Sequence, residues 1–246
     1  IGRANKLMLN LCDRLTVGHL KVKGIKKKYN DKIFYTGNPI RPEIYKYKKD
    51  YKTHHQDGFL NLLIFGGSQG ASFFSDIIPD SINKLDNKKK SLLRVFHQVR
   101  NNEFERVKKC YHSMNVKSEV KTFFYNLPEL LNNSHLLISR SGASTVAEVA
   151  ATKTPAIFIP FHHSIDDDQR LNTIELEKIG QVIVKNEKKL DSNQLYKVID
   201  ELIEKPEILE KMAKANKEIV VNNSSEKIRS IIDDLLSNRE LWFENN

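Results

Sequence analysis

The chain has 246 residues, and its 40 lysines and arginines outnumber its 31 aspartates and glutamates, which gives a formal net charge of +9. With 39% hydrophobic residues it can bury a core, so disordered and fibrous classes are excluded. No run approaches the ~20 apolar residues of a membrane-spanning helix, and the N-terminal segment is too charged for a secretory signal. Cys12 and Cys110 lack CxxC spacing, so we expect neither a disulfide framework nor a zinc knuckle, and a reducing cytoplasm is the expected compartment.

The first 44 residues predict a helix at 3–11 and short strands at 14–17 and 32–35. Forty-four residues are too few for a doubly wound domain, and Ile1 is not a translation start. We therefore expect residues 1–44 to be the C-terminal remnant of an N-terminal domain. Residues 45–58 are rich in lysine, tyrosine and histidine without a hydrophobic period, which is typical of a linker.

From residue 61 to 184, short apolar runs alternate with amphipathic stretches, as in βαβ units. Strands are predicted at 61–65, 92–98, 120–124, 136–139, 156–160 and 181–184. Helices are predicted at 71–85, 101–112, 127–131, 144–151 and 168–179. This spacing favours an α/β fold with a parallel sheet covered by helices on both faces.

After residue 185 only helices are predicted, at 192–203, 206–220 and 224–236. Ser192 and Ser224 are the expected N-caps, and Pro206 is expected in a first turn. We expect residues 59–246 to form one C-terminal domain, with the final helix a candidate to pack back on the N-terminal domain.

The first of three unusual loops follows the strand at 61–65 and reads Gly66-Gly67-Ser68-Gln69-Gly70-Ala71. Ligands of open parallel sheets bind beyond the carboxyl ends of the strands. Glycines let backbone N–H groups approach an oxyanion, and the following helix start adds partial positive charge, so the loop indicates a phosphate site. A tight strand-to-helix turn without a ligand is the alternative.

The second loop begins at Ser139 and runs through small residues to Glu148. Ser144 and Glu148 are four residues apart and share a helical face, ~6 Å apart along the axis. A diphosphate at the helix start would leave ribose hydroxyls near Glu148, whose carboxylate can accept two hydrogen bonds from them. The alternative is a first-turn carboxylate that only stabilises the helix dipole.

The third loop spans residues 160–172 and contains two histidines and three aspartates. We predict no metal site, because no helical histidine pair or recognised ligand spacing accompanies them. An acid-rich helix start is a sufficient structural explanation. A further possibility is that aspartate and amide side chains here bind sugar hydroxyls, since Gln169 and Asn172 are three apart and adjacent on one face.

Five blocks in order resemble the MurG family, bacterial glycosyltransferases that move N-acetylglucosamine from UDP-GlcNAc to undecaprenyl-linked lipid I in peptidoglycan synthesis. The blocks are residues 2–6, 36–41, 66–71 and 139–148, and residues 166–169 with Asn172. The resemblance implies a GT-B enzyme, with two Rossmann-like domains across a cleft and the donor bound mainly by the C-terminal one. It also implies an inverting, metal-independent reaction without a cofactor.

The resemblance assigns the nucleotide contacts to residues of the first two loops. Glu148 would hold the ribose hydroxyls, and Ser144 and Thr145 would line the diphosphate at the helix start. Ser68 and Gln69 would contact the phosphates from the glycine loop.

The same resemblance makes Arg41 the cation of the interdomain loop and lets the backbone at Phe124 read the uracil edge. Asp168 and Gln169 would contact the transferred sugar. The sequence departs from the family at Asp168, where an amide or a histidine is usual.

The family's general base belongs to its N-terminal domain, whose glycine-rich loops and histidine have no counterpart in this sequence. We therefore assign no catalytic residue and expect the chain to be inactive alone. The alternative is a nucleotide-sugar-binding half that works with a separate N-terminal half. Lysine-rich segments at 21–28 and 46–52 fit peripheral association with the cytoplasmic face of the bacterial inner membrane. No nucleic-acid partner is expected, because no binding motif accompanies the lysines.

Overall fold

The computed structural model describes residues 2–19, 22, 24–46, 51, 58–67, 71–162, 167–215 and 223–244. Contacts divide the chain into two units. One combines Ile1–Ile40 with Glu218–Asn246, and the other is Arg41–Lys217. Most of the linker predicted at 45–58 lies outside the described residues.

The smaller unit contains a parallel pair of short strands, β1 (Leu15–Val17) and β2 (Ile33–Tyr35). Helix α1 (Arg3–Met8) precedes β1, the 3-10 helix η1 (Lys27–Lys32) leads into β2, and α12 (Ser224–Glu244) is the unit's last element. The strands predicted at 14–17 and 32–35 are confirmed to within one residue. Parallel pairing requires a crossover between the strands, which is the connection expected in a Rossmann-like domain.

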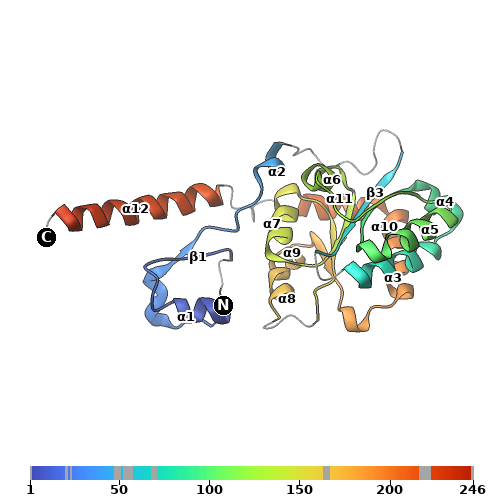
Figure 1. The fold of residues 1–246 in the computed structure, drawn as a ribbon. Helices are drawn as coiled ribbons and strands as arrows, with labels where there is room; N and C mark the ends of the chain where they lie inside the picture. The colour runs from blue at the N-terminus through green and yellow to red at the C-terminus, as the bar shows by residue number, and fades with distance from the viewer. Residues whose placement is uncertain are drawn as a thin grey trace. The chain divides into compact units, whose positions relative to one another are not determined.

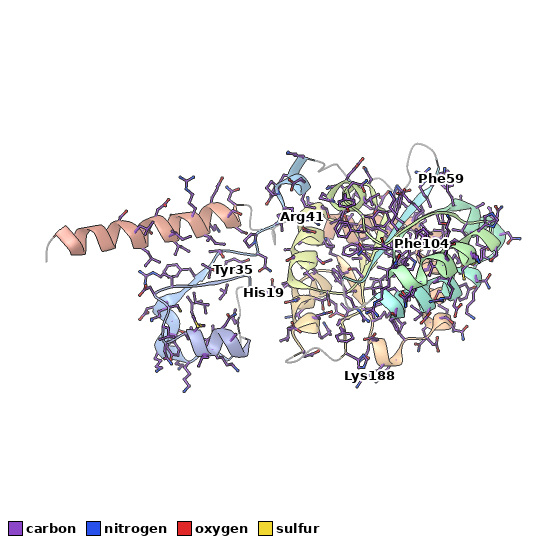
Figure 2. The ribbon with its side chains drawn as sticks, in the orientation of Figure 1. His19, Tyr35, Arg41, Phe59, Phe104 and Lys188 are labelled. Carbon is purple, nitrogen blue, oxygen red and sulfur yellow. The ribbon has the colours of Figure 1, made fainter. Side chains whose placement is uncertain are left out.

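A close backbone approach occurs within this unit at Gly18, directly after β1. A Cβ atom at this position would overlap the side-chain amide of Asn38, so only glycine fits without a rearrangement. The loop 36–41, which the sequence singled out, is thus packed against the end of β1. His19 and Tyr35 of this unit are labelled in Figure 2.

Among the described residues of the larger unit, six strands form one sheet in the order β5-β4-β3-β6-β7-β8, with every neighbouring pair parallel. The chain starts in the middle of the sheet at β3, builds outward to β5, then returns to the centre at β6. This order is that of a doubly wound α/β domain and confirms the predicted fold class. The strands are β3 (Leu60–Phe65), β4 (Leu93–Gln98), β5 (Lys117–Lys121), β6 (Leu136–Ser139), β7 (Ala156–Phe158) and β8 (Val182–Val184).

Helices lie on both sides of this sheet, with α7 and α9 on one side and α3, α5 and α10 on the other (Figure 1). The helices are α2 (Pro42–Lys46), α3 (Ala71–Asn83), α4 (Asn87–Leu92), α5 (Phe104–Ser113), α6 (Leu127–Asn133), α7 (Ala143–Thr152), α8 (Asp168–Asn172), α9 (Ile174–Lys178), α10 (Ser192–Glu204) and α11 (Pro206–Ala215). Short 3-10 helices occur at η2 (Asn101–Glu103) and η3 (Glu187–Lys189).

The central strand β3 is buried at all six positions, because helices cover both of its faces. Leu62 and Ile64 share a core cluster with Phe74 and Ile78 of α3. Each such side chain contributes about 1.5–3 kcal/mol when fully buried. The core therefore fixes β3, and with it the direction in which the glycine loop leaves the sheet.

The strand predicted at 120–124 is wrong in its bounds, since β5 spans Lys117–Lys121. β5 is the edge strand of the sheet, and Val120 is its one buried residue. Charged and polar residues are common on edge strands, where they oppose edge-to-edge association. The sequence favoured the apolar run that follows, which instead forms the connection to α6.

The structure also corrects the prediction of one helix and of two N-caps, and it adds one helix. The helix predicted at 168–179 is divided into α8 and α9. Helix α4 was not predicted, although Asp86 caps it by accepting a hydrogen bond from the backbone of Lys89. The N-cap of α10 is Asp191 rather than Ser192, and Ser224 is the first helical residue of α12 rather than its cap.

Candidate functional site

The strand order of the larger unit reverses between β3 and β6, which are direct neighbours. Phe65 at the end of β3 pairs in register with Ser139 at the end of β6. The two loops predicted to bind phosphate therefore begin side by side at the carboxyl edge. In doubly wound sheets, the crevice at such a reversal is where ligands bind.

The glycine loop after β3 starts with a buried Gly66 and turns at Gly67, whose φ of +66° lies in the left-handed region. Glycine adopts this conformation without steric cost, whereas other residues are strained there. The next three residues, which include the predicted phosphate contacts Ser68 and Gln69, lie outside the described residues. Their roles stay predictions.

The second loop leads from β6 into α7, whose N-cap is Gly142. Because glycine has no side chain, it cannot cap the N–H groups of the first helical turn, and these remain suited to an anionic ligand. Ser144 is exposed and Thr145 is half-buried in this turn. The position of both residues at the start of a ten-residue helix fits the diphosphate role predicted for them.

Glu148 lies in the second turn of α7 and is buried, so the alternative interpretation, a first-turn carboxylate that only stabilises the helix dipole, is wrong. Its partner is Arg41, whose Nε lies 2.6 Å from Oε1 and whose Nη2 lies 2.7 Å from Oε2. The hydrogen bonds from Arg41 to Glu148 raise the pKa of this arginine above its ordinary value. The structure thus brings together two predicted site residues, and Arg41 is labelled in Figure 2.

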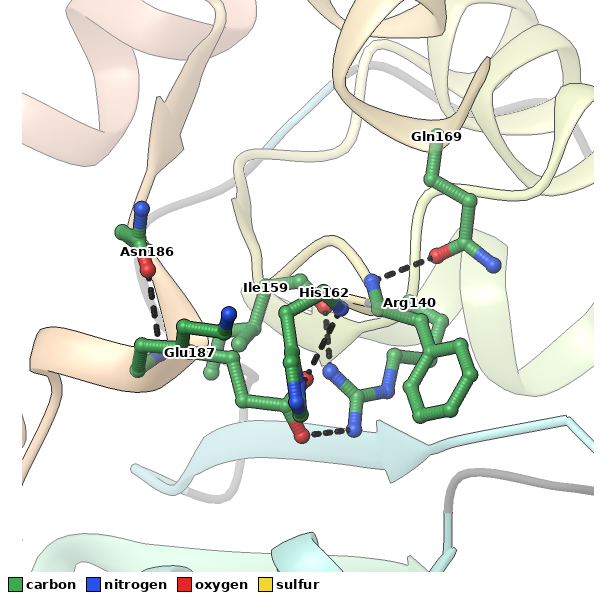
Figure 3. Close-up of polar contacts among 8 residues, drawn as sticks. Arg140, Ile159, His162, Gln169, Asn186 and Glu187 are labelled. Atoms are coloured by element: carbon green, nitrogen blue, oxygen red, sulfur yellow. Dashed lines mark hydrogen bonds and ion pairs between the residues drawn. The ribbon is translucent and has the colours of Figure 1, made fainter. Parts of the chain in front are cut away.

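Arg140, the first residue after β6, is a buried cation at the same edge. Its Nη1 donates to the carbonyl of Ile159 at 2.9 Å, and its Nη2 donates to Glu187 at 2.5 Å (Figure 3). The guanidinium lies 5.1–5.4 Å from the ring centroids of Phe73, Phe74 and Phe161. Its Nε finds no acceptor among the residues that the structure describes.

Glu187 follows β8 in η3, and its carboxylate joins Arg140 to His162. The other carboxylate oxygen accepts the backbone N–H of His162 at 3.1 Å and lies 2.7 Å from Nδ1 of the same residue. Burial alone would raise the pKa of Glu187, but the hydrogen bonds from Arg140 and His162 outweigh it, so that pKa is lowered. Glu187 is therefore an ionised carboxylate at neutral pH.

Helix α8 is tied to the second loop by three residues that share hydrogen bonds. Ser141 Oγ donates to the carbonyl of Gln169 at 2.9 Å, and Asn172 Nδ2 donates to the carbonyl of Ser141 at 3.0 Å. The side-chain oxygen of Gln169 accepts the backbone N–H of Phe161 at 3.0 Å (Figure 3). Asp168 is exposed at the first position of α8. The amides of Gln169 and Asn172 thus build the loop scaffold, and their predicted sugar contacts stay predictions.

Phe124 is buried in the connection that leaves β5, at the same edge of the sheet. Lys121 Nζ lies 5.7 Å from its ring centroid. The neighbouring Phe123 and Tyr125 are exposed and contact each other edge to face, with 4.9 Å between their ring centroids. The predicted base contact through the backbone of Phe124 remains a prediction.

Within the described part of the chain, no group of three histidine, cysteine, aspartate or glutamate side chains could hold a metal ion. His163 and Asp166 of the third loop lie outside that part. The cluster of Arg140, Glu187 and His162 was missed by sequence reasoning. An arginine that directly follows a mostly apolar strand signals a buried cation, but nothing local marks Glu187 as its partner 47 residues later.

Comparison with known protein families finds that residues 61–235 match the glycosyltransferase family 28 C-terminal domain. The matched region contains the whole six-stranded sheet except the first residue of β3.

Two curated relatives carry the name UDP-N-acetylglucosamine–N-acetylmuramyl-(pentapeptide) pyrophosphoryl-undecaprenol N-acetylglucosamine transferase. The protein of Bartonella quintana is 34% identical over 242 residues, which are 98% of this chain and 63% of the relative. The protein of Rhizobium etli strain CIAT 652 is 36% identical over 220 residues, which are 88% of this chain and 58% of the relative. Among solved structures, Acinetobacter baumannii MurG aligns with a TM-score of 0.74 at 23% identity, covering 94% of this chain and 64% of that chain. The chain thus spans about three fifths of the length of its relatives.

Proposed function

Because the chain belongs to glycosyltransferase family 28 through the C-terminal domain of that family, we propose that Arg41–Lys217 binds UDP-N-acetylglucosamine as a glycosyl donor. The relatives named above are N-acetylglucosamine transferases, and they share a third of their aligned residues with this chain. The proposed acceptor is the undecaprenyl-linked lipid I, so the product is lipid II of peptidoglycan synthesis.

One observation carries this proposal, namely the adjacency of β3 and β6 at the reversal of strand order. It brings Gly66 and the start of α7 to the same edge of the sheet, with the buried carboxylate of Glu148 one turn further along the helix. A diphosphate at the helix start and a ribose at Glu148 fit this spacing, since an ionised carboxylate can accept hydrogen bonds from two adjacent hydroxyls.

The proposed reaction is inverting and uses no metal. The 4-hydroxyl oxygen of the acceptor's N-acetylmuramyl group forms a bond to the anomeric carbon, while the bond from that carbon to the diphosphate breaks and UDP leaves with the electron pair. Helix N–H groups and a cation stabilise the charge that grows on the diphosphate. A general base takes the hydroxyl proton, and we place that base in an N-terminal half that the relatives contain.

We assign residues 1–44 to the end of that N-terminal domain, residues 45–58 to a linker and residues 59–246 to the donor-binding domain, with α12 as the final helix that packs back on the N-terminal domain. A second candidate function follows from the span of only 63% of a relative. In that case the chain is a nucleotide-sugar-binding half that becomes a transferase with a separately supplied N-terminal half. Reading the coding sequence upstream of residue 1 for an in-frame N-terminal half distinguishes the two, because only the first function requires that half in the same polypeptide.

We further propose that the protein acts at the cytoplasmic face of the inner membrane as a peripheral protein. None of the described helices combines the length and apolarity needed to cross a bilayer. Lysines near anionic headgroups contribute about 1 kcal/mol each, so binding should depend on salt. Sedimentation with anionic liposomes at low and high salt tests this, and equal binding at both salt concentrations would contradict it.

Calorimetric titration tests the donor proposal directly. We expect UDP-N-acetylglucosamine to bind at least several-fold more tightly than UDP-N-acetylgalactosamine, which differs at one hydroxyl. Glu148→Ala should weaken UDP binding about 10- to 100-fold, since hydrogen bonds to charged groups are worth about 1.5–3 kcal/mol. Glu207→Ala, an exposed first-turn glutamate of α11, is the matched control and should leave the titration unchanged. An unchanged titration with Glu148→Ala would remove the proposed site.

A further inference from the structure

Arg140 joins four elements that surround the candidate site. Its backbone continues from β6, one Nη contacts the residue that follows β7, and the other contacts η3 after β8. Two of the rings around its guanidinium, Phe73 and Phe74, belong to the first turn of α3. We propose that Arg140 is a positioning residue, which holds the loops after β6, β7 and β8 in the arrangement that binds the nucleotide sugar, and that Glu187 is the countercharge that keeps it there. This inference rests on the proposed function.

The contacts of Arg140 show why it positions the site rather than binding the donor. Its side chain is 7% exposed, and both terminal nitrogens are already engaged by Ile159 and Glu187. The guanidinium also lies within 5.4 Å of three aromatic ring centroids, close enough for cation–π attraction. We therefore expect the N–H groups of the helix to bind a diphosphate at the start of α7. Arg140 would instead support the loops through its buried contacts.

Movement of Arg140 would be passed directly to the proposed diphosphate site. Ser141 and Gly142 follow it in the chain, and Gly142 is the N-cap of α7. Ser141 is also hydrogen-bonded to α8 through Gln169 and Asn172. A shift at Arg140 would thus displace both the first turn of α7 and the start of α8.

A gain in stability is a poor explanation for the buried pair of Arg140 and Glu187. Both side chains of the Arg140–Glu187 pair are less than one tenth exposed, and desolvation of a buried pair often offsets its attraction. Nε of Arg140 also lacks an acceptor in the described part of the chain, and a buried unsatisfied donor is costly. Local features that cost stability are expected at functional sites, where they fix geometry.

The test compares UDP affinity by calorimetry with thermal stability by circular dichroism, using the full chain and five variants, one of them a control. Arg140→Met and Glu187→Gln each leave one buried partner without its mate, so each should lower the melting temperature. The double variant Arg140→Met/Glu187→Gln removes both charges and should recover much of that loss. We expect UDP affinity to fall at least tenfold in Arg140→Met and to stay low in the double variant, because the loops lack their common anchor.

Arg140→Lys keeps the charge but not the planar fork, so it should also lose at least fivefold in UDP affinity, and it carries the test if Arg140→Met does not fold. Lys89→Met is the control, because Lys89 pairs with Asp200 at 2.6 Å between α4 and α10. It should lower the melting temperature and leave UDP affinity unchanged.

Each outcome decides between distinct conclusions. If the unaltered chain does not bind UDP, the proposed function is overturned and this inference with it. If the unaltered chain binds UDP and folded Arg140→Met or Arg140→Lys binds it equally well, only the positioning role is overturned. If UDP affinity and the melting temperature both recover in the double variant, the role of the pair is purely structural. That result would also overturn the positioning role.

Discussion

Arg41 donates two hydrogen bonds to Glu148 from 107 residues away in the sequence, at distances of 2.6 and 2.7 Å. The side chain of Arg41 is 43% exposed, whereas that of Glu148 is 7% exposed. The partly exposed arginine therefore contacts a buried carboxylate, and burial of a polar group without a hydrogen-bond partner is costly. A carboxylate has about four lone-pair sites, so two remain for the ribose hydroxyls that we propose it binds.

Replacing Arg41 by methionine should destabilise the larger unit by about 2 kcal/mol. Breaking a fully buried ion pair costs about 3–5 kcal/mol, and water screens part of this interaction because the arginine is partly exposed. For a unit of this size, the melting temperature should fall by about 4–8 °C. Thermal unfolding followed by circular dichroism measures the change.

Arg106→Met provides the matched control for that measurement. Arg106 also forms an ion pair at 2.6 Å, with Asp76, but both side chains are about half exposed or more. Exposed pairs contribute about 0–1 kcal/mol, so the melting temperature should change little. Equal destabilisation by both variants would contradict the special role of the pair formed by Arg41 and Glu148.

His97 should make the protein less stable in mild acid. It is fully buried near the end of β4, with Nδ1 lying 2.9 Å from the hydroxyl of Tyr111, and burial lowers its pKa to about 3. Between pH 3 and the ordinary histidine pKa of about 6.5, the unfolded chain binds a proton that the folded chain does not. Stability contributed by the neutral ring is therefore present above about pH 6.5 and is lost as pH falls, by about 2 kcal/mol between pH 7 and pH 5.

Denaturant unfolding at pH 7 and pH 5 checks this dependence. His97→Gln lacks the titrating ring, so its stability should fall by about 2 kcal/mol less than that of the unaltered chain over this range. His112→Gln alters an exposed histidine of α5 and should keep the original pH dependence. If His97→Gln and the unaltered chain showed the same pH dependence, His97 would not be the group that causes the loss of stability in acid.

Asp191 should be worth about 1 kcal/mol to α10 as its N-cap. Its carboxylate accepts the backbone N–H of Gln194 at 2.7 Å, and the side chain of Gln194 accepts the backbone N–H of Asp191 at 3.1 Å. Asp191→Ala should lower the melting temperature by about 2–4 °C. Ser192→Ala alters the residue that the sequence favoured as the cap and should have a smaller effect. The reverse ranking in a thermal melt would restore the prediction from sequence.

Asp168→Asn should strengthen the binding of UDP-N-acetylglucosamine about two- to tenfold and leave UDP binding nearly unchanged. If Asp168 contacts the transferred sugar, as we propose, an amide can both donate to and accept from its hydroxyls, whereas a carboxylate only accepts. The exposed position of Asp168 at the start of α8 makes a large loss of stability unexpected. Titration with both ligands separates the sugar from the nucleotide contribution, and an equal change for both would exclude a sugar contact.

Most of the order of strands and helices from β3 to α11 could be predicted from the sequence, because hydrophobic periodicity and glycine or proline boundaries are local properties. The glycine loop after β3 and the small-residue loop before α7 were recognisable for the same reason. Errors concentrated where local signals are weak, as at the edge strand β5, whose residues are mostly exposed, and at the short helix α4.

By itself, the sequence determined the α/β class and the two loops that carry the proposed phosphate contacts. Only the tertiary structure decided that β3 and β6 are neighbours, that Arg41 pairs with Glu148, and that Arg140 pairs with Glu187. Strand order and ion pairing join residues far apart in the chain. Their partners are chosen by the packing of helices on the sheet and by the cost of burying a charge alone, and neither leaves a pattern in neighbouring residues.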